Sequence, residues 1–91
     1  MASLPGGTVT FLFTDIEGST RRWEKHREAM QAAVGRHDEL LRQAVESNRG
    51  HVFKTGGDAI YAVFASAPDA VLAALGGQRR LTGEDWGEVG P

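Results

Sequence analysis

Two kinds of hydrophobic pattern alternate along this 91-residue chain. Residues 8–14 (TVTFLFT) are apolar or β-branched at both sets of alternate positions, which predicts a strand buried on both faces and central in its sheet. Residues 28–47 carry apolar side chains at three- and four-residue spacing, which predicts one long helix. The apolar positions of that helix are Met30, Ala33, Val34, Leu41, Ala44 and Val45.

Two short apolar runs follow, at residues 51–55 and 59–64. The sequence Gly-Gly-Asp at 56–58 lies between them and predicts an antiparallel hairpin that spans residues 51–64. Phe53 is expected in the core of the domain.

A last helix is predicted after residue 66, where Ser66 and Asp69 have the spacing of a helix cap. Its expected buried stripe is Val71, Leu72 and Leu75. Gly76-Gly77 costs about 2 kcal/mol relative to two alanines, so the helix is expected to end early. Residues 82–91 are predicted to form a loop.

Smaller signals concern the helix ends and one histidine. Ser19 or Thr20 is placed to cap a short helix that contains Trp23, another expected core residue. Gly50 is expected to be the left-handed residue that ends the long helix. His37 lies on the apolar stripe of that helix, so we expect it to be hydrogen-bonded and partly buried rather than a metal ligand.

The order strand, helices, strand, strand, helix predicts an α+β, ferredoxin-like fold. One more strand would complete such a unit, so we expect a truncated fold. We expect a lead-in at residues 1–7, a partial domain at 8–81 and a tail at 82–91. The uncovered edge of the strand at 8–14 favours self-association.

Composition excludes several classes of protein. The chain has 10 basic and 12 acidic residues, a formal net charge of -2, which is no nucleic-acid-binding signature. It has no cysteine for a disulfide or a thiolate metal site. Neither a membrane span nor a signal peptide is evident, so a cytoplasmic location is expected.

Two aspartates carry the candidate chemistry. Asp15 ends the first strand and Asp58 lies in the hairpin turn, so the two carboxylates converge if their strands are neighbours. Carboxylates together with a backbone carbonyl and phosphate oxygens suit Mg²⁺ or Mn²⁺. The amides of residues 17–20, at a helix start, can bind anionic oxygens. The alternative is that Asp15 is a helix cap and Asp58 an ordinary turn residue.

The sequence also resembles a known family. Residues 13–20 (FTDIEGST), with Trp23-Glu24, resemble the opening of the catalytic domain of class III adenylyl and guanylyl cyclases. Residues 50–59 (GHVFKTGGDA) resemble a second segment of that domain. The intervening helix is similar to the bacterial branch often joined to transcriptional regulators.

The resemblance implies a two-metal site with Mg²⁺ or Mn²⁺. In it Asp15 and Asp58 are the metal-binding aspartates, and the Ile16 carbonyl is a further ligand. The implied reaction is attack of the ribose 3′-hydroxyl of ATP on the α-phosphorus, which gives cyclic AMP and pyrophosphate.

The resemblance also implies the substrate contacts. Gly18, Ser19 and Thr20 would contact the triphosphate. Lys54 matches the purine-selecting position, where lysine goes with ATP and glutamate with GTP. Gly56 departs from the family, which usually has an aliphatic residue there.

The family's domain is about twice as long as this chain. Its second half carries the other purine contact, the ribose-orienting asparagine, the transition-state arginine and much of the dimer interface. We therefore expect no useful activity from the chain alone. A homodimer, or pairing with a complete cyclase domain, is the expected partnership.

Two alternatives stay open at this point. Residues 13–20 loosely resemble the first motif of haloacid-dehalogenase-type phosphatases, but Glu17 stands where that chemistry needs a second aspartate. The other alternative is a non-catalytic remnant that binds metal-nucleotide or forms dimers.

Overall fold

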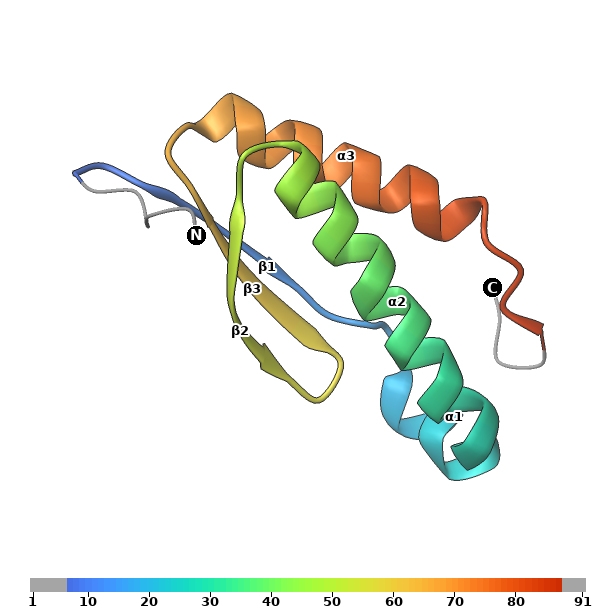
Figure 1. Ribbon diagram of the computed structural model, residues 1–91. Coiled ribbons are helices and arrows are strands. Elements are labelled where there is room, and N and C mark those ends of the chain that lie inside the picture. The colour runs from blue at the N-terminus through green and yellow to red at the C-terminus, as the bar shows by residue number, and fades with distance from the viewer. Residues whose placement is uncertain (1–6, 88–91) are drawn as a thin grey trace.

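The computed structural model describes residues 7–87 and shows an α+β fold (Figure 1). The elements are β1 (Thr10–Thr14), α1 (Ser19–Lys25), α2 (Arg27–Ser47), β2 (His51–Gly56), β3 (Ala59–Phe64) and α3 (Ala67–Thr82). The strands form one antiparallel sheet in the order β1-β3-β2. This confirms the predicted element order, the hairpin at 51–64 and the long helix.

The core lies between the sheet and helices α2 and α3. Phe64 and Ile60 of the central strand β3 are its largest fully buried side chains. Leu41 and Val45 of α2 pack in the same cluster. Ile60 and Phe64 are therefore buried by helices that lie over a single face of the sheet (Figure 1).

β1 and the outer face of the sheet correct two predictions from the sequence. It is an edge strand of the described sheet, not a central one. Its outer face is open, with Phe11 56% and Phe13 63% exposed. Phe53, expected in the core, is 45% exposed on the same face. The rings of Phe11, Phe13, Phe53 and Tyr61 contact one another and form an outer aromatic row.

α3 corrects two more predictions. It continues through Gly76-Gly77, and a Cβ on Gly77 would come within 2.7 Å of Leu41 Cδ2. The glycine therefore allows α3 to approach α2 closely, and packing outweighs its low helix propensity. The buried residues of α3 are Ala70, Ala73 and Gly77. The residues expected to be buried are exposed instead: Val71, Leu72 and Leu75.

The helix ends show one success and one error. The Ser66 side chain accepts a hydrogen bond from the Asp69 amide at 3.3 Å, which confirms the predicted cap. After α2 the left-handed residue is Arg49, with φ 65°, not Gly50. Gly50 is needed for space, because a Cβ there would lie 2.3 Å from Cε2 of Phe64.

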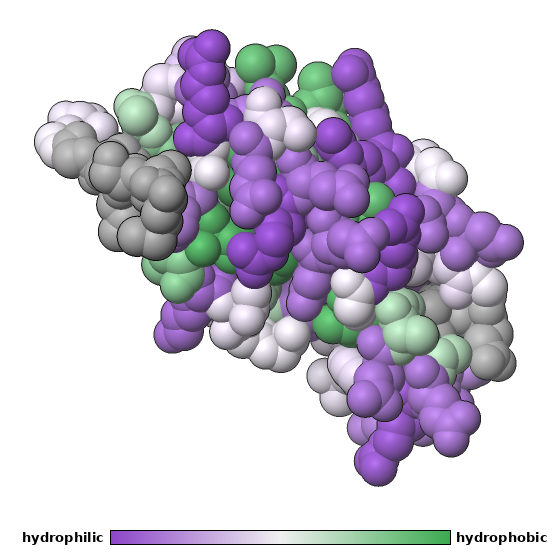
Figure 2. Space-filling model, viewed as in Figure 1, coloured by the Kyte–Doolittle hydropathy of each residue, from purple (hydrophilic) through white to green (hydrophobic). Residues whose placement is uncertain are grey.

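The helical side of the molecule is covered mainly by hydrophilic side chains (Figure 2). His37 is hydrogen-bonded as predicted, with Nδ1 2.9 Å from a carboxylate oxygen of Asp38, but it is buried more deeply than the partial burial that was predicted. Among residues 7–87, no helix is long and apolar enough to cross a membrane.

Candidate functional site

The end of β1 and the β2–β3 turn meet at one edge of the sheet. β1 pairs with β3 in a register that sets Thr14 opposite Ile60, so the residues that follow β1 lie beside the turn that precedes β3. The Asp15 side chain lies within hydrogen-bonding reach of the Asp58 carboxylate. The convergence of the two aspartates, predicted on the condition that their strands are neighbours, is present.

The surroundings of Asp58 favour its ionised form. Burial alone would raise its pKa. Hydrogen bonds from the Ser19 hydroxyl and from the backbone amides of Asp58 and Ile16 favour the charged form, and the pKa lies below its ordinary value. Asp58 is therefore held as a carboxylate.

One oxygen of that carboxylate lacks a partner. Oδ2 of Asp58 is buried and has no hydrogen bond within residues 7–87. A buried, unpaired carboxylate oxygen is unfavourable, and a cation placed between Asp15 and Asp58 would remove that cost. The donor chemistry of this corner of the fold thus fits a divalent ion.

The rest of the ligand set must be oxygen atoms other than side-chain carboxylates. The described part of the chain contains no group of three or more His, Cys, Asp or Glu residues arranged to hold a metal. Two carboxylates, the Ile16 carbonyl and external oxygens would leave Mg²⁺ or Mn²⁺ several positions for phosphate and water. Such a set suits an ion that keeps part of its coordination shell for other oxygen ligands.

The turn between β1 and α1 differs from its prediction. Gly18, with φ 69° and ψ 21°, is the N-cap residue of α1, and no side chain caps the helix. The expected cap from Ser19 or Thr20 is therefore wrong. The Ser19 hydroxyl is directed instead to Asp58.

Sequence reasoning missed two contacts that hold this turn. One is the hydrogen bond of Ser19 to Asp58, which links the start of α1 to the β2–β3 turn. The other is a hydrogen bond from the Arg22 guanidinium to the Glu17 carbonyl. No pattern in the sequence signals either contact, because each depends on how the turn folds back.

Lys54 lies on the outer face of the sheet. Its Nζ is 5.6 Å from the centre of the Tyr61 ring. An ammonium group over an aromatic ring is attracted by the ring's π-electrons. Lys54, the predicted purine-selecting residue, is therefore on β2 and lies beside the aromatic row. The two carboxylates lie elsewhere, Asp15 after the end of β1 and Asp58 in the β2–β3 turn.

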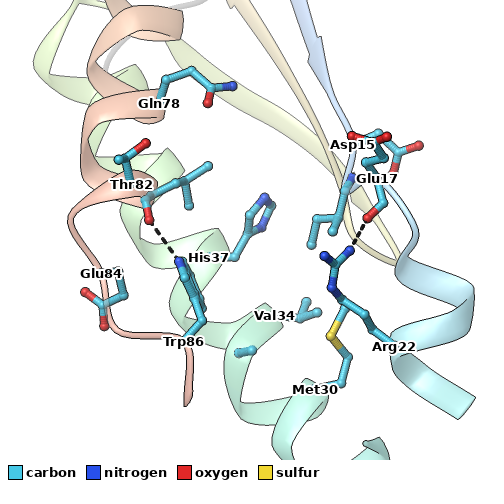
Figure 3. A pocket seen from close by; sticks show the side chains of 13 residues that line it. Asp15, Glu17, Arg22, Met30, Val34, His37, Gln78, Thr82, Glu84 and Trp86 are labelled. Atoms are coloured by element: carbon cyan, nitrogen blue, oxygen red, sulfur yellow. Dashed lines mark hydrogen bonds between the residues drawn. The ribbon is translucent and has the colours of Figure 1, made fainter. Parts of the chain in front are cut away.

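An open pocket of about 540 Å³ adjoins Asp15 between the sheet end, α2 and α3. In Figure 3 His37 lies in the middle of the pocket. Asp15 and Glu17 lie on one side of it, and Trp86 lies on the other. The Trp86 indole donates a hydrogen bond to the Leu81 carbonyl at 2.8 Å. The segment after α3 thus forms one wall of a cavity next to the carboxylates.

The chain is similar to known cyclases over most of its length. A family model, "Adenylate and Guanylate cyclase catalytic domain", matches residues 1–78. An adenylate cyclase of Schizosaccharomyces pombe is 37% identical over 84 residues, which is 92% of this chain and 5% of that protein. One of Podospora anserina is 39% identical over 82 residues, which is 90% of this chain and 4% of that protein.

Comparison with solved structures also finds adenylate cyclases. An adenylate cyclase of Trypanosoma brucei, in its monomeric state, superposes with a TM-score of 0.83 at 35% identity. The match covers 87% of this chain and 34% of the solved one. The chain therefore spans about a third of that structure and a small part of the curated relatives. The phosphatase alternative is not favoured by any of these similarities. The chain belongs to the adenylate and guanylate cyclase catalytic domain family.

Proposed function

We propose that this chain is the metal- and phosphate-binding part of an adenylyl cyclase that converts ATP to cyclic AMP and pyrophosphate. The observation that carries the proposal is the pair Asp15 and Asp58, brought together at the sheet end with a buried, unpartnered Oδ2 on Asp58. The similarity to proteins named adenylate cyclase supports the choice of reaction.

In this proposal Asp15, Asp58 and the Ile16 carbonyl hold two Mg²⁺ or Mn²⁺ ions. When bound, the ions supply activation of the ribose 3′-hydroxyl and stabilisation of charge on the phosphates. Ser19 holds the Asp58 carboxylate in place and favours its ionised form. The side chains are thus ordered before the ions arrive, which reduces the cost of assembling the site.

Gly18, Ser19 and Thr20 form the proposed phosphate contact. α1 begins without a side-chain cap, so its first amides are available to anionic oxygens. Gly18 adopts the left-handed conformation that turns the chain from β1 into α1. The polyphosphate would then lie beside the carboxylate pair.

The remaining groups of the site would come from outside these residues. The chain spans 34% of a solved relative of the same fold, and we propose that it acts as a homodimer or together with a complete cyclase domain. Transition-state charge stabilisation contributes several kcal/mol in comparable reactions, roughly 3–4 kcal/mol per donor. The 91-residue chain alone is therefore proposed to bind metal-nucleotide without turnover.

An assay for cyclic AMP with Mn²⁺ and ATP tests the activity. We expect no product from the 91-residue chain and measurable product from the chain extended by the residues that follow it in its gene. Product from the short chain would contradict the need for the remaining groups. Absence of product from an extended chain that binds ATP would contradict the reaction itself.

The Lys54→Glu variant tests the purine contact. An ammonium donates a hydrogen bond to N1 of adenine, whereas a carboxylate accepts from N1–H and the amino group of guanine. We expect the preference for ATP over GTP to fall by roughly tenfold or more, because a charged hydrogen bond is lost. Fluorescence titration with labelled ATP and GTP in Mn²⁺ measures this. Lys25→Glu, which changes an exposed lysine of α1, is the charge-matched control and is expected to leave the ratio unchanged.

A further inference from the structure

The turn between β1 and α1 contains a residue that leaves its backbone free to rotate. Gly18 adopts φ 69° and ψ 21°, in the left-handed region that glycine enters without a steric penalty. Glycine is about equally stable at negative φ, so Gly18 itself offers little resistance to rotation of the peptide plane that joins it to Glu17. Another group must therefore hold this peptide in one orientation.

The Arg22 side chain holds that peptide. Its guanidinium donates a hydrogen bond to the Glu17 carbonyl, drawn as a dashed line in Figure 3. A Cβ added to Gly18 would lie 3.2 Å from Nη1 of Arg22, so the guanidinium lies close to both residues of the peptide. No backbone amide within residues 7–87 donates to the Glu17 carbonyl. Arg22 therefore supplies a hydrogen bond that the backbone does not.

The place of Arg22 in α1 suits this contact. Its amide donates to the Gly18 carbonyl at 3.2 Å, which puts it one helical turn after Gly18. Helical side chains tilt toward the N-terminus, so a long side chain at this position reaches back over the residues before the helix. Arg22 is half-buried and lines the pocket next to Asp15, whereas Arg21 is exposed. One residue thus holds two successive carbonyls of the turn.

The orientation of this peptide decides where Ser19 lies. The peptide unit is planar, so a fixed Glu17 carbonyl also fixes the amide of Gly18 and the direction in which the chain enters α1. Ser19 is the next residue, and its hydroxyl is hydrogen-bonded to the Asp58 carboxylate. Rotation of the peptide would displace that hydroxyl from Asp58. Arg22 is therefore connected to Asp58 through the turn and Ser19.

We propose that Arg22 is a positioning residue of the metal site, which fixes the Glu17–Gly18 peptide so that Ser19 reaches Asp58. This rests on the proposed function, in which Asp58 is a metal ligand. Arg22 acts before the ion binds, by ordering the turn that holds the ligand. A site that is ordered in advance binds more tightly, because less conformational freedom is lost on binding.

The sign of the effect on metal affinity separates positioning from electrostatics. A guanidinium near two carboxylates repels a divalent cation, so its charge alone predicts that replacing Arg22 tightens Mn²⁺ binding. Positioning predicts weaker binding instead. Arg22→Met removes the charge and the hydrogen-bond donors but keeps a long side chain of similar helix propensity. The packing of its stem against the pocket wall is thereby retained.

Electron paramagnetic resonance of Mn²⁺ without nucleotide measures this effect. We expect Arg22→Met to bind Mn²⁺ roughly tenfold more weakly than the natural chain, as is usual when a group that orients a metal ligand is lost. Arg22→Lys keeps a donor on a long stem and should recover most of the affinity. Arg21→Met removes the same charge from an exposed neighbour in α1 and should not weaken binding. Unchanged or tighter binding by Arg22→Met, or an equal loss in Arg21→Met, would overturn the proposal.

The double variant Ser19→Ala/Arg22→Met tests whether Arg22 acts through Ser19. If it does, the double variant should lose no more Mn²⁺ affinity than Ser19→Ala, roughly tenfold. Independent effects would multiply to a loss of roughly 100-fold. The larger loss would contradict the proposed route from Arg22 to Asp58.

Backbone dynamics of the metal-free chain give a test that does not depend on the metal site. Amide order parameters of Gly18 and Ser19 from nuclear magnetic resonance should fall in Arg22→Met, from about 0.85 toward 0.6, and stay unchanged in Arg21→Met. Circular dichroism checks that both variants fold. Equal order parameters in Arg22→Met and the natural chain would overturn the positioning role. A natural chain with an ordered turn that binds no Mn²⁺ would instead overturn the proposed function.

Discussion

Replacing Gly50 with alanine is expected to lower the free energy of unfolding by about 1–3 kcal/mol. The added Cβ would lie 2.3 Å from Cε2 of Phe64 and 2.7 Å from Cγ1 of Val45. Phe64 is fully buried, and Gly50 joins α2 to β2 through a hydrogen bond from its amide to the Val45 carbonyl. Neither the ring nor the backbone can move without disturbing the core.

Gly35→Ala is the matched control for this substitution. Gly35 lies in the exposed middle of α2, and a Cβ there meets nothing within 4 Å. Alanine is the better helix former, so stability should rise by about 0.8 kcal/mol. Thermal unfolding followed by circular dichroism should therefore give shifts of opposite sign. A Gly50→Ala variant as stable as the natural chain would contradict the close packing of α2, β2 and β3.

Replacing Asp58 with alanine is expected to weaken Mn²⁺-dependent ATP binding by roughly 100-fold or more, since even indirect changes around a metal site cost 10–100-fold. Asp58 is ionised, buried at Oδ2 and adjacent to Asp15. Ser19→Ala should cause a smaller loss, roughly tenfold, because it removes only the group that positions Asp58.

Isothermal titration of ATP in Mn²⁺, repeated in EDTA, measures these effects. Glu17→Gln removes a carboxylate from the same turn without touching the proposed ligands, so its affinity should match that of the natural chain. An equal loss in Glu17→Gln and Asp58→Ala would show that general negative charge, not a specific ligand, governs binding.

Features of the fold that depend on neighbouring residues in sequence were predictable. The Ser66 cap needs only Asp69, three residues later, and it is present at 3.3 Å. The β2–β3 hairpin follows from two apolar runs about a short glycine turn, and the register of the strands bears this out. These two signals act over a few residues and hold in the fold, whereas the equally local predictions of a cap at Ser19 or Thr20 and of a left-handed Gly50 do not.

Features that depend on which surface is covered were not predictable. The alternation in β1 defines two faces, yet it cannot tell that the helices cover only one and leave Phe11 and Phe13 exposed. In α3 the large residues looked like the buried stripe, whereas close contact with α2 selects the small ones. Gly77 weakens a helix in isolation but permits that contact.

The candidate site was predictable in part. Its two aspartates were identified because each follows or precedes a recognisable strand, and the β1–β3 pairing brings them together. The link from Ser19 to Asp58 had no signal, since it requires the turn after β1 to fold back over the β2–β3 turn. Lys54 was identified by resemblance alone, and its place over Tyr61 emerges only from the fold.

The central claim is that Asp15 and Asp58 together hold a divalent metal ion. A Mn²⁺ titration followed by electron paramagnetic resonance, with no nucleotide present, tests it most directly, because free Mn²⁺ gives a sharp signal that binding broadens. The natural chain should bind Mn²⁺, and Asp15→Ala/Asp58→Ala should leave the added ion free. Equal binding by both chains would contradict the claim.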